Sequence, residues 1–151
     1  MEVIVKNSGN RVRERTPNKV NEKIDRKTLD RIRQYRELPK EEIDARIETL
    51  RTEWGMERSL EVNASTMALT GVLLGALVNR KWYLLSGLAA GFLLQYGLQG
   101  WCPPVPLFRA FKVRTRREID EEIYAMKEVR GDFNDLSPES SSVELLAAFR
   151  K

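Results

Sequence analysis

The chain contains no histidine and only one cysteine, Cys102. Histidine is the usual general base, the usual zinc ligand and the usual partner of a nucleophilic Ser or Cys. A single cysteine excludes an internal disulfide and a metal site built from several thiolates. No acid–base–nucleophile constellation is visible in the rest of the sequence. These absences predict that the protein is not an enzyme, and they predict no catalytic residue, metal site or cofactor.

Charge is absent from the centre of a chain that is otherwise rich in it. Charged residues make up 32% of the 151 residues, yet Val62–Asn79 and Trp82–Phe108 contain none. A helix that spans a bilayer needs about 20 mainly apolar residues. The flanks carry only narrow apolar stripes, which could not cover two helices that are apolar on nearly every side. The sequence therefore predicts an all-α membrane protein with a two-helix transmembrane hairpin, spanning at residues 62–78 and 82–101.

Small and amide side chains predict how the two spans pack. The short turn at Asn79–Lys81 requires antiparallel neighbours. With Lys81 at the centre, Gly71 and Gly75 face Gly91 and Gly87, and small residues allow close backbone approach in a membrane. Packing of the same glycines between two chains is the alternative. The expected packing set, in which Asn63 faces Gln99 and Met67 faces Gln95, is Gly71, Gly75, Gly87, Gly91, Asn63, Gln95 and Gln99.

Flanking charge predicts the orientation. Arg51 and Arg58 precede the first span, five basic residues follow the second, and the turn between them carries only Arg80 and Lys81. Because positive charge stays in the cytoplasm, both termini are expected to be cytoplasmic. Aromatic and basic residues at the two interfaces are expected to contact the bilayer and its anionic head groups. The expected interface anchors are Trp82, Tyr83, Trp101, Phe108, Arg109, Lys112 and Arg114.

Cys102 lies where the second span meets Pro103, Pro104 and Pro106. We expect Gly100 and Pro103 to end the helix, and Pro104 and Pro106 to hold an extended path in the head-group zone. A helix C-terminus disfavours the thiolate, whereas Arg109 or Arg114 would favour it if the chain folds back. A structural cysteine, thiol or sulfur chemistry, and a haem-regulatory Cys-Pro site are the open interpretations.

The flanking segments are polar and charged. Residues 1–20 are expected to form a flexible basic arm, and residues 21–60 a cytoplasmic amphipathic αα-hairpin broken at Pro39. Residues 1–40 hold 12 basic and 6 acidic side chains, whereas residues 41–61 hold 3 and 7. The two helices could pair basic against acidic, or the arm could bind lipid head groups. Interleaved acids and few aromatic residues argue against nucleic acid. The expected apolar stripes are Ile24, Leu29, Ile32 and Tyr35, then Ile43, Ile47, Leu50 and Trp54.

The membrane region is expected over residues 61–112, and it contains the hairpin and the proline-rich segment after it. The C-terminal tail follows. Thr115 and Glu118 form a capping box for a cytoplasmic amphipathic helix over residues 113–131, which Gly131 should end. Its apolar stripe consists of Ile119, Ile123 and Met126. Residues 132–151 are expected to form a linker and a short terminal helix.

The sequence around the proline-rich segment resembles a known family. A helical hairpin followed by Gly100, Cys102, Pro103 and Thr115 is similar to the YgaP-like inner-membrane domain of bacteria. The resemblance covers about Ala64–Thr115, and it implies a bacterial inner membrane and self-association through hairpins. Some relatives carry a rhodanese domain, for which this chain has neither the length nor the active-site loop. Many members have glycine where Lys112 stands, so the turn after Phe111 is expected to differ.

Three functions remain compatible with the sequence. The first is a membrane-anchored interaction or scaffold protein that forms a homo-oligomer through the hairpin and binds a cytoplasmic protein partner. The second is a sulfur- or redox-handling module that uses Cys102. The third is a small pore or transporter component, in which Gln95 and Gln99 line the interior of an oligomer.

Overall fold

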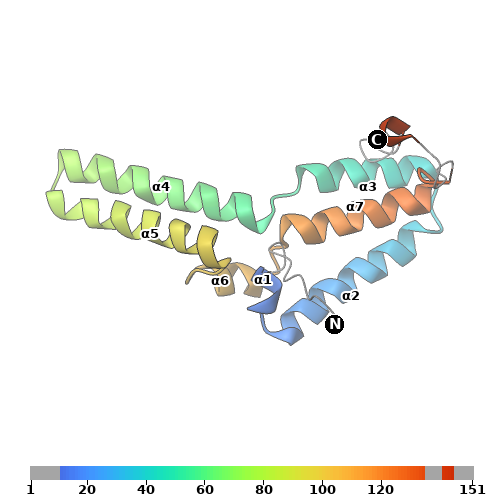
Figure 1. Ribbon diagram of the computed structural model, residues 1–151, viewed down its shortest axis with the longest axis horizontal. Coiled ribbons are helices and arrows are strands. Elements are labelled where there is room, and N and C mark those ends of the chain that lie inside the picture. Colours follow the sequence, from blue (N-terminus) through green and yellow to red (C-terminus); the bar gives the residue numbers. More distant parts are fainter. Residues whose placement is uncertain (1–10, 135–140, 145–151) are drawn as a thin grey trace. The chain divides into compact units, whose positions relative to one another are not determined.

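The computed structural model describes residues 11–134 and 141–144, and within these residues every regular element is a helix (Figure 1). This confirms the predicted all-α class. The chain divides into two compact units. Of the described residues, the α4–α5 unit contains 11–24 together with Trp54–Arg117. The three-helix unit contains Asp25–Glu53 and the described residues from Glu118 onward.

Two long helices, α4 (Met56–Leu77) and α5 (Tyr83–Gln99), lie side by side in opposite directions (Figure 1). The short helix η2 (Arg80–Trp82) joins them, and the side chain of Asn79 accepts a 2.9 Å hydrogen bond from the Lys81 amide at its start. At the other end, α5 stops at Gly100, whose φ of 67° lies in the left-handed region that glycine adopts without strain. The second apolar helix therefore ends before the first proline, as the sequence predicts.

The pairs that face each other along α4 and α5 differ from the predicted pairs. A Cβ atom at Gly71 would lie 2.8 Å from the backbone nitrogen of Ser86, and a Cβ atom at Gly75 would lie 2.8 Å from the ring of Tyr83. A Cβ atom at Gly87 or Gly91 would meet nothing within 4 Å. The prediction that the two glycine pairs face each other is therefore wrong.

The turn explains this difference in register. Leu77 ends α4, and Asn79 has an extended backbone with φ −156° and ψ 132°. The η2 residues that follow lead directly into α5, because Trp82 already has helical dihedral angles. The chain therefore reverses at Asn79 and not at Lys81. This brings Ser86 and Tyr83 against α4, instead of Gly87 and Gly91.

The proline-rich segment forms the helix α6 (Val105–Ala110) instead of the extended path that the sequence predicts. Pro106 occupies the first turn of α6, where a helix does not use the N–H that proline lacks, and where its fixed φ suits the helix. The Val105 amide donates a 3.0 Å hydrogen bond to the carbonyl of Cys102. Val105 is buried, so the segment folds onto the protein.

Residues 11–20 contain two helical pieces and two buried side chains, Val12 and Thr16, in contrast to the flexible arm predicted over residues 1–20. They contain α1 (Arg11–Glu14) and the start of α2 (Asn18–Tyr35). The Thr16 hydroxyl donates a 2.6 Å hydrogen bond to the carbonyl of Val12, which is buried. No periodic pattern marks Val12, because its burial depends on residues distant in the sequence. Residues 1–10 lie outside the described part of the chain.

One apolar cluster holds the base of the α4–α5 unit together. Its buried members come from α1, from the first turns of α4, and from the segment after α5. Tyr96, Phe108 and Val113 pack against it while remaining partly exposed. The buried members are Val12, Met56, Leu60, Cys102 and Val105.

The three-helix unit packs the apolar faces of α3 (Lys40–Thr52) and α7 (Arg116–Arg130), with Ile32 and Tyr35 of α2 against them. The stripes predicted for α3 and α7 are confirmed by this core. The sequence assigns these helices to separate segments, residues 21–60 and 113–131, whereas the structure joins them in one unit. The buried core residues are Ile43, Ile47, Leu50, Ile119, Ile123 and Met126.

Two members of the predicted stripes lie outside this core. Leu29 is 52% exposed, because it lies one position away from the face of α2 that carries Ile32 and Tyr35. Trp54 is 51% exposed. Helix α3 ends at Thr52 and the backbone of Glu53 is extended, so Trp54 no longer continues the helical period.

The last described helix begins and ends as the sequence predicts. Helix α7 starts directly after Thr115 and stops at Gly131, which has a φ of 91°. Ser141 and Glu144 form a capping box, in which each side chain accepts a hydrogen bond from the other residue's amide, at 3.3 and 2.9 Å. The rest of the predicted linker and terminal helix, residues 135–140 and 145–151, lies outside the described residues.

Candidate membrane surface and the Cys102 site

The outward side of α4 and α5 is a continuous apolar surface, which we call the outer surface. Helix α5 has 17 residues and no charged side chain, and its only buried residue is Ala89. Leu77, Leu84 and Leu98 are each at least 70% exposed. Exposed apolar patches of this extent mark contact with a membrane or a partner. The large exposed side chains of this surface are Leu69, Val72, Leu73, Leu77, Leu84, Leu88, Leu94 and Leu98.

By length and composition, one helical segment among the described residues is long and apolar enough to cross a membrane. It lies within Lys40–Leu77, and its apolar window falls in α4, with 17% of the window buried. Helix α5 is shorter than α4. The structure therefore supplies one membrane-spanning candidate by this criterion, whereas the sequence predicts two.

Polar side chains on α4 satisfy their hydrogen bonds inside the protein. The hydroxyls of Thr66 and Thr70 each donate a 2.7 Å hydrogen bond to a carbonyl one turn earlier in the same helix. The amide of Asn63 donates to the Ser59 carbonyl at 3.2 Å. The Ser86 hydroxyl crosses from α5 to the Ala68 carbonyl at 2.7 Å. These groups are bonded without help from water.

The residues of the predicted amide pairs have different surroundings. Asn63 and Met67 line a cavity with Phe92 and Tyr96 of α5. Gln95 is half-buried and Gln99 is exposed, and neither is part of that lining. The register set by Asn79 explains this outcome, because it moves α5 along α4 relative to the predicted pairing.

The predicted interface anchors separate into two groups. Trp82 and Tyr83 lie half-exposed at the turn, and Trp101 follows the opposite end of α5. Phe108 is partly exposed and packs against the apolar cluster at the base of the α4–α5 unit, which we call the basal cluster. Arg114 is buried. Trp82, Tyr83 and Trp101 thus lie at the two ends of α5, whereas Arg114 does not extend outward as an anchor would.

Arg109 is also buried, at 1% exposure, and it does not extend outward as an anchor. Its guanidinium donates to the Thr16 hydroxyl at 3.2 Å, to the Asn21 side-chain oxygen at 2.6 Å and to the Val113 carbonyl at 3.2 Å. These bonds tie α6 to the start of α2 and compensate the burial of the charge. Reasoning from sequence missed this network because its members are 88 to 93 positions apart.

Lys112 is the exposed basic residue after α6, and it has a φ of 62°. Among the residues that the structure describes, every other residue with a positive φ is a glycine. Its amide donates a 2.9 Å hydrogen bond to the Arg109 carbonyl, which closes the turn after α6. Left-handed backbone strains a side chain and favours glycine, so this turn has the geometry of a glycine position.

Cys102 is 3% exposed and belongs to the basal cluster. Burial raises the pKa of its thiol, and a hydrogen bond with the Val105 backbone opposes that rise. The guanidinium of Arg109, which could have favoured a thiolate, is directed to Thr16, Asn21 and the Val113 carbonyl instead. The site therefore keeps the thiol protonated near neutral pH.

Arg11 caps the end of α5, which sequence reasoning also missed. Its guanidinium donates to the carbonyl of Leu98 at 3.0 Å and to that of Gly97 at 3.4 Å. These carbonyls belong to the last turn of α5, where a helix has no donors of its own and carries partial negative charge. A basic residue predicted to lie in a flexible arm thus contacts the backbone of its own protein.

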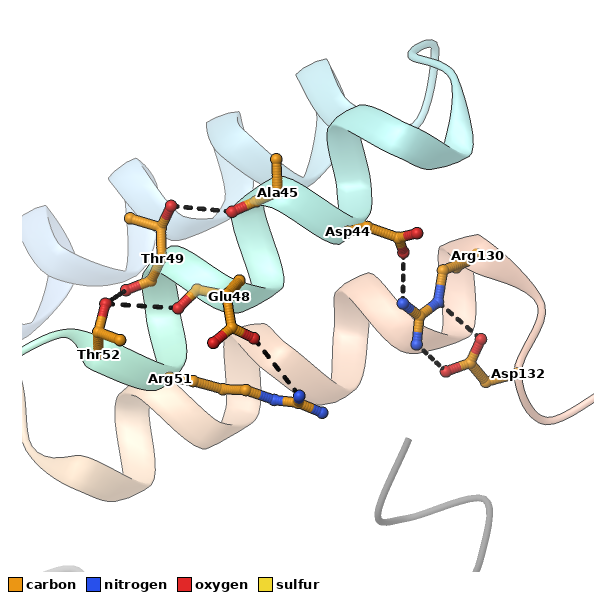
Figure 2. A network of polar contacts seen from close by, with 8 residues as sticks. All are labelled: Asp44, Ala45, Glu48, Thr49, Arg51, Thr52, Arg130 and Asp132. Carbon is orange, nitrogen blue, oxygen red and sulfur yellow. Dashed lines mark hydrogen bonds and ion pairs between the residues drawn. The ribbon is translucent and has the colours of Figure 1, made fainter.

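A buried carboxylate lies in the three-helix unit. The side chain of Glu122 is fully buried and accepts from Arg46 at 2.9 and 3.3 Å and from Arg31 at 3.1 Å. It joins α2, α3 and α7. Other ion pairs of this unit are exposed to solvent. Figure 2 shows one of them, between Glu48 and Arg51 of α3, at 3.5 Å.

Arg130 forms a second polar group at the end of α7 (Figure 2). It pairs with Asp44 of α3 and bonds Asp132 through two nitrogens, with 2.7 Å between Nε and Oδ1. The hydrogen bonds that the Arg130 guanidinium donates to Asp132 are the main cause that raises its pKa, and it therefore stays charged at any physiological pH.

Within residues 11–134 and 141–144, no three His, Cys, Asp or Glu side chains are grouped so that they could hold a metal ion. The described residues thus show an apolar surface, a buried thiol and structural ion pairs. No protein-family model, no curated protein and no solved structure matches this chain.

Proposed function

We propose that the protein is a membrane-anchored interaction protein. Helices α4 and α5 span the bilayer as a hairpin, and the three-helix unit lies in the cytoplasm and binds a protein partner. The single observation that carries the proposal is the outer surface, where large apolar side chains such as Leu77 at 81% and Leu84 at 71% are exposed. In water these side chains would oppose folding, and in a bilayer they would be solvated by acyl chains.

Helix length supports this proposal. At 1.5 Å per residue, the charge-free part of α4, Val62–Leu77, and the 17 residues of α5 extend about 24 and about 26 Å. The hydrocarbon core is about 30 Å thick, and spanning helices use about 17 to 25 residues. Helix α5 is at the lower end of that range, and Trp101 follows it at a position suited to the interface.

The internal hydrogen bonds of Thr66, Thr70 and Ser86 meet a requirement of a lipid environment, although Thr49 of the three-helix unit bonds to its own helix in the same way. A hydrocarbon solvent offers no donors or acceptors, so polar groups on a spanning helix must bond within the protein. Thr66 and Thr70 are exposed on α4 and still bond to its backbone. This arrangement is what lipid requires of exposed hydroxyl groups.

We propose that both termini are cytoplasmic, with the turn at Asn79–Lys81 on the opposite side. Exposed Lys112 and Arg116 follow the second helix, and Arg58 lies in the first turn of α4. The burial of Arg109 and Arg114 removes two charges from the surface but not from the cytoplasmic side. The positive-inside rule counts basic residues near the spans and therefore still favours this orientation.

We propose that the chain is a member of the YgaP-like family and lies in a bacterial inner membrane. Three motif residues have structural positions that support it: Gly100 ends α5 in a left-handed conformation, while Cys102 and Thr115 are buried. Lys112, where many members have glycine, also has a positive φ. On this interpretation the motif specifies the base of the hairpin, and Cys102 acts as a core residue. We therefore favour an interaction protein over sulfur chemistry.

Cysteine accessibility tests the topology. The Cys102→Ser variant supplies a background without cysteine, into which Lys81→Cys or Lys112→Cys is introduced. A membrane-impermeant maleimide should label Lys81→Cys in intact cells, and Lys112→Cys only after the membrane is permeabilised. Labelling of both positions in intact cells, or of neither before permeabilisation, would contradict the proposed hairpin.

A further inference from the structure

A cavity of about 200 Å³ lies in the α4–α5 unit, between the two helices and the Cys102–Phe108 segment. Its floor contains Leu60, Ala89 and Cys102, each less than 5% exposed. Its rim contains Met67 and Leu107, which are 45% and 61% exposed. The cavity is therefore closed on the protein side and opens among exposed apolar side chains.

The lining determines which molecules the cavity can hold. An apolar cavity of about 150 Å³ stays free of water and binds small apolar molecules. This cavity is larger, and its polar groups are limited to Asn63, Tyr96 and the thiol of Cys102. Water would find too few partners along the apolar walls, whereas a hydrocarbon chain would contact them throughout.

The rim is exposed at Met67 and Leu107, so the occupant comes from the medium that surrounds the α4–α5 unit. We propose that the cavity binds one acyl chain of a membrane phospholipid, an inference that rests on the proposed membrane anchoring. The chain enters between Met67 and Leu107 and ends against Ala89. The hydroxyl of Tyr96 and the amide of Asn63 are the groups that can donate to an ester carbonyl of the lipid.

Two alanines provide a matched pair of variants. Ala89 forms part of the floor and is 3% exposed, whereas its neighbour Ala90 is exposed on α5. Ala89→Leu places a larger side chain in the cavity, and Ala90→Leu adds the same atoms outside it. Ala64→Leu fills the cavity from α4 and guards against a folding defect specific to Ala89→Leu.

The experiment uses the full chain in vesicles of phosphatidylethanolamine and phosphatidylglycerol that contain a phospholipid with a diazirine in its acyl chain. After irradiation, mass spectrometry maps the crosslinked peptides. We expect crosslinks to Cys102–Phe108 that fall about tenfold in Ala89→Leu and in Ala64→Leu, because one added group in a close-fitting apolar pocket has effects of this size. Ala90→Leu should retain them.

Two results would overturn the inference, and they are distinguishable. If the outer surface crosslinks but Cys102–Phe108 does so equally in all variants, the cavity is not an acyl-chain site and the membrane anchoring still holds. If no residue of α4 or α5 crosslinks, the membrane anchoring is wrong, and the acyl-chain site is wrong with it.

Discussion

The two units are both helical, but they distribute apolar and charged side chains in opposite ways. In the three-helix unit, apolar residues such as Ile47 and Ile119 are buried and charge covers the outside. In the α4–α5 unit, leucines such as Leu77 and Leu84 are exposed, while Arg109 is buried at the base. The hydrophobic effect builds the first arrangement in water. Exposed apolar surface of this extent marks contact with a membrane or with a protein partner.

The largest expected effect is in the three-helix unit, at its buried carboxylate. Glu122→Gln should lower the free energy of unfolding by about 3 kcal/mol, because Arg46 and Arg31 lose the charge that compensates their partial burial. Urea unfolding of the full chain in detergent, followed by circular dichroism, measures this loss. Glu48→Gln removes an exposed pair and should cost less than about 0.5 kcal/mol. Equal effects would show that Glu122 is not a buried organiser of the unit.

In the α4–α5 unit, alanine substitution should have different effects on stability at Gly71, which contacts α5, and at Gly87, which faces open space. Gly71→Ala places a Cβ atom 2.8 Å from the Ser86 nitrogen and 2.9 Å from the Trp82 carbonyl oxygen, both of which belong to backbone. We expect a loss of about 2 kcal/mol, typical of overpacking between elements. Gly87→Ala meets nothing within 4 Å and should be neutral or stabilising. Thermal unfolding of the detergent-solubilised chain measures both.

The control variant also tests self-association. If two chains pack through Gly87 and Gly91, alanine there should reduce crosslinked oligomers without changing the stability of the single chain. Loss of stability in Gly87→Ala as well as in Gly71→Ala would contradict the observed register and restore the pairing predicted from the sequence, in which both glycines lie at the contact.

A smaller effect is expected at the end of α5. Arg11→Gln removes the cation that donates to the carbonyls of Leu98 and Gly97 and should cost about 0.5 kcal/mol, the usual size of a charge at a helix end. Hydrogen exchange at the Gly100 amide, which bonds Tyr96, should quicken about twofold. Arg15→Gln, an exposed change nearby, is the control. Equal exchange in both variants would show that Arg11 is not a cap.

At Cys102 the expected effect is on the reactivity of the thiol. Because burial raises the pKa of this thiol, less thiolate is present near neutral pH than at an exposed cysteine. Alkylation by iodoacetamide should be slower than that of Lys112→Cys in a Cys102→Ser background, and its rate should rise at higher pH. Faster alkylation of Cys102 near neutral pH would revive the sulfur or redox function.

Features determined by local sequence were predictable. Periodicity identified the buried stripes of α3 and α7, Gly100 and Gly131 marked two helix ends, and the absence of charge marked α4 and α5. The register failed because it assumed a symmetric turn, whereas the capping bond of Asn79 moves the reversal along the chain.

Features that depend on distant residues were not predictable from pattern. Arg109 and Arg114 have the composition of membrane anchors, and only tertiary structure shows that both are buried. Arg11 resembles a member of a disordered arm until its contact with Leu98 is known. The cavity has no sequence signature either, because its floor and rim come from segments between Leu60 and Phe108.

Alkaline carbonate extraction of membranes from cells that express the full chain tests the central claim most directly. If lipid surrounds the outer surface, the protein should remain in the membrane pellet and dissolve only when detergent is added. Release into the carbonate supernatant, followed by recovery of a folded monomer in detergent-free buffer, would contradict the account.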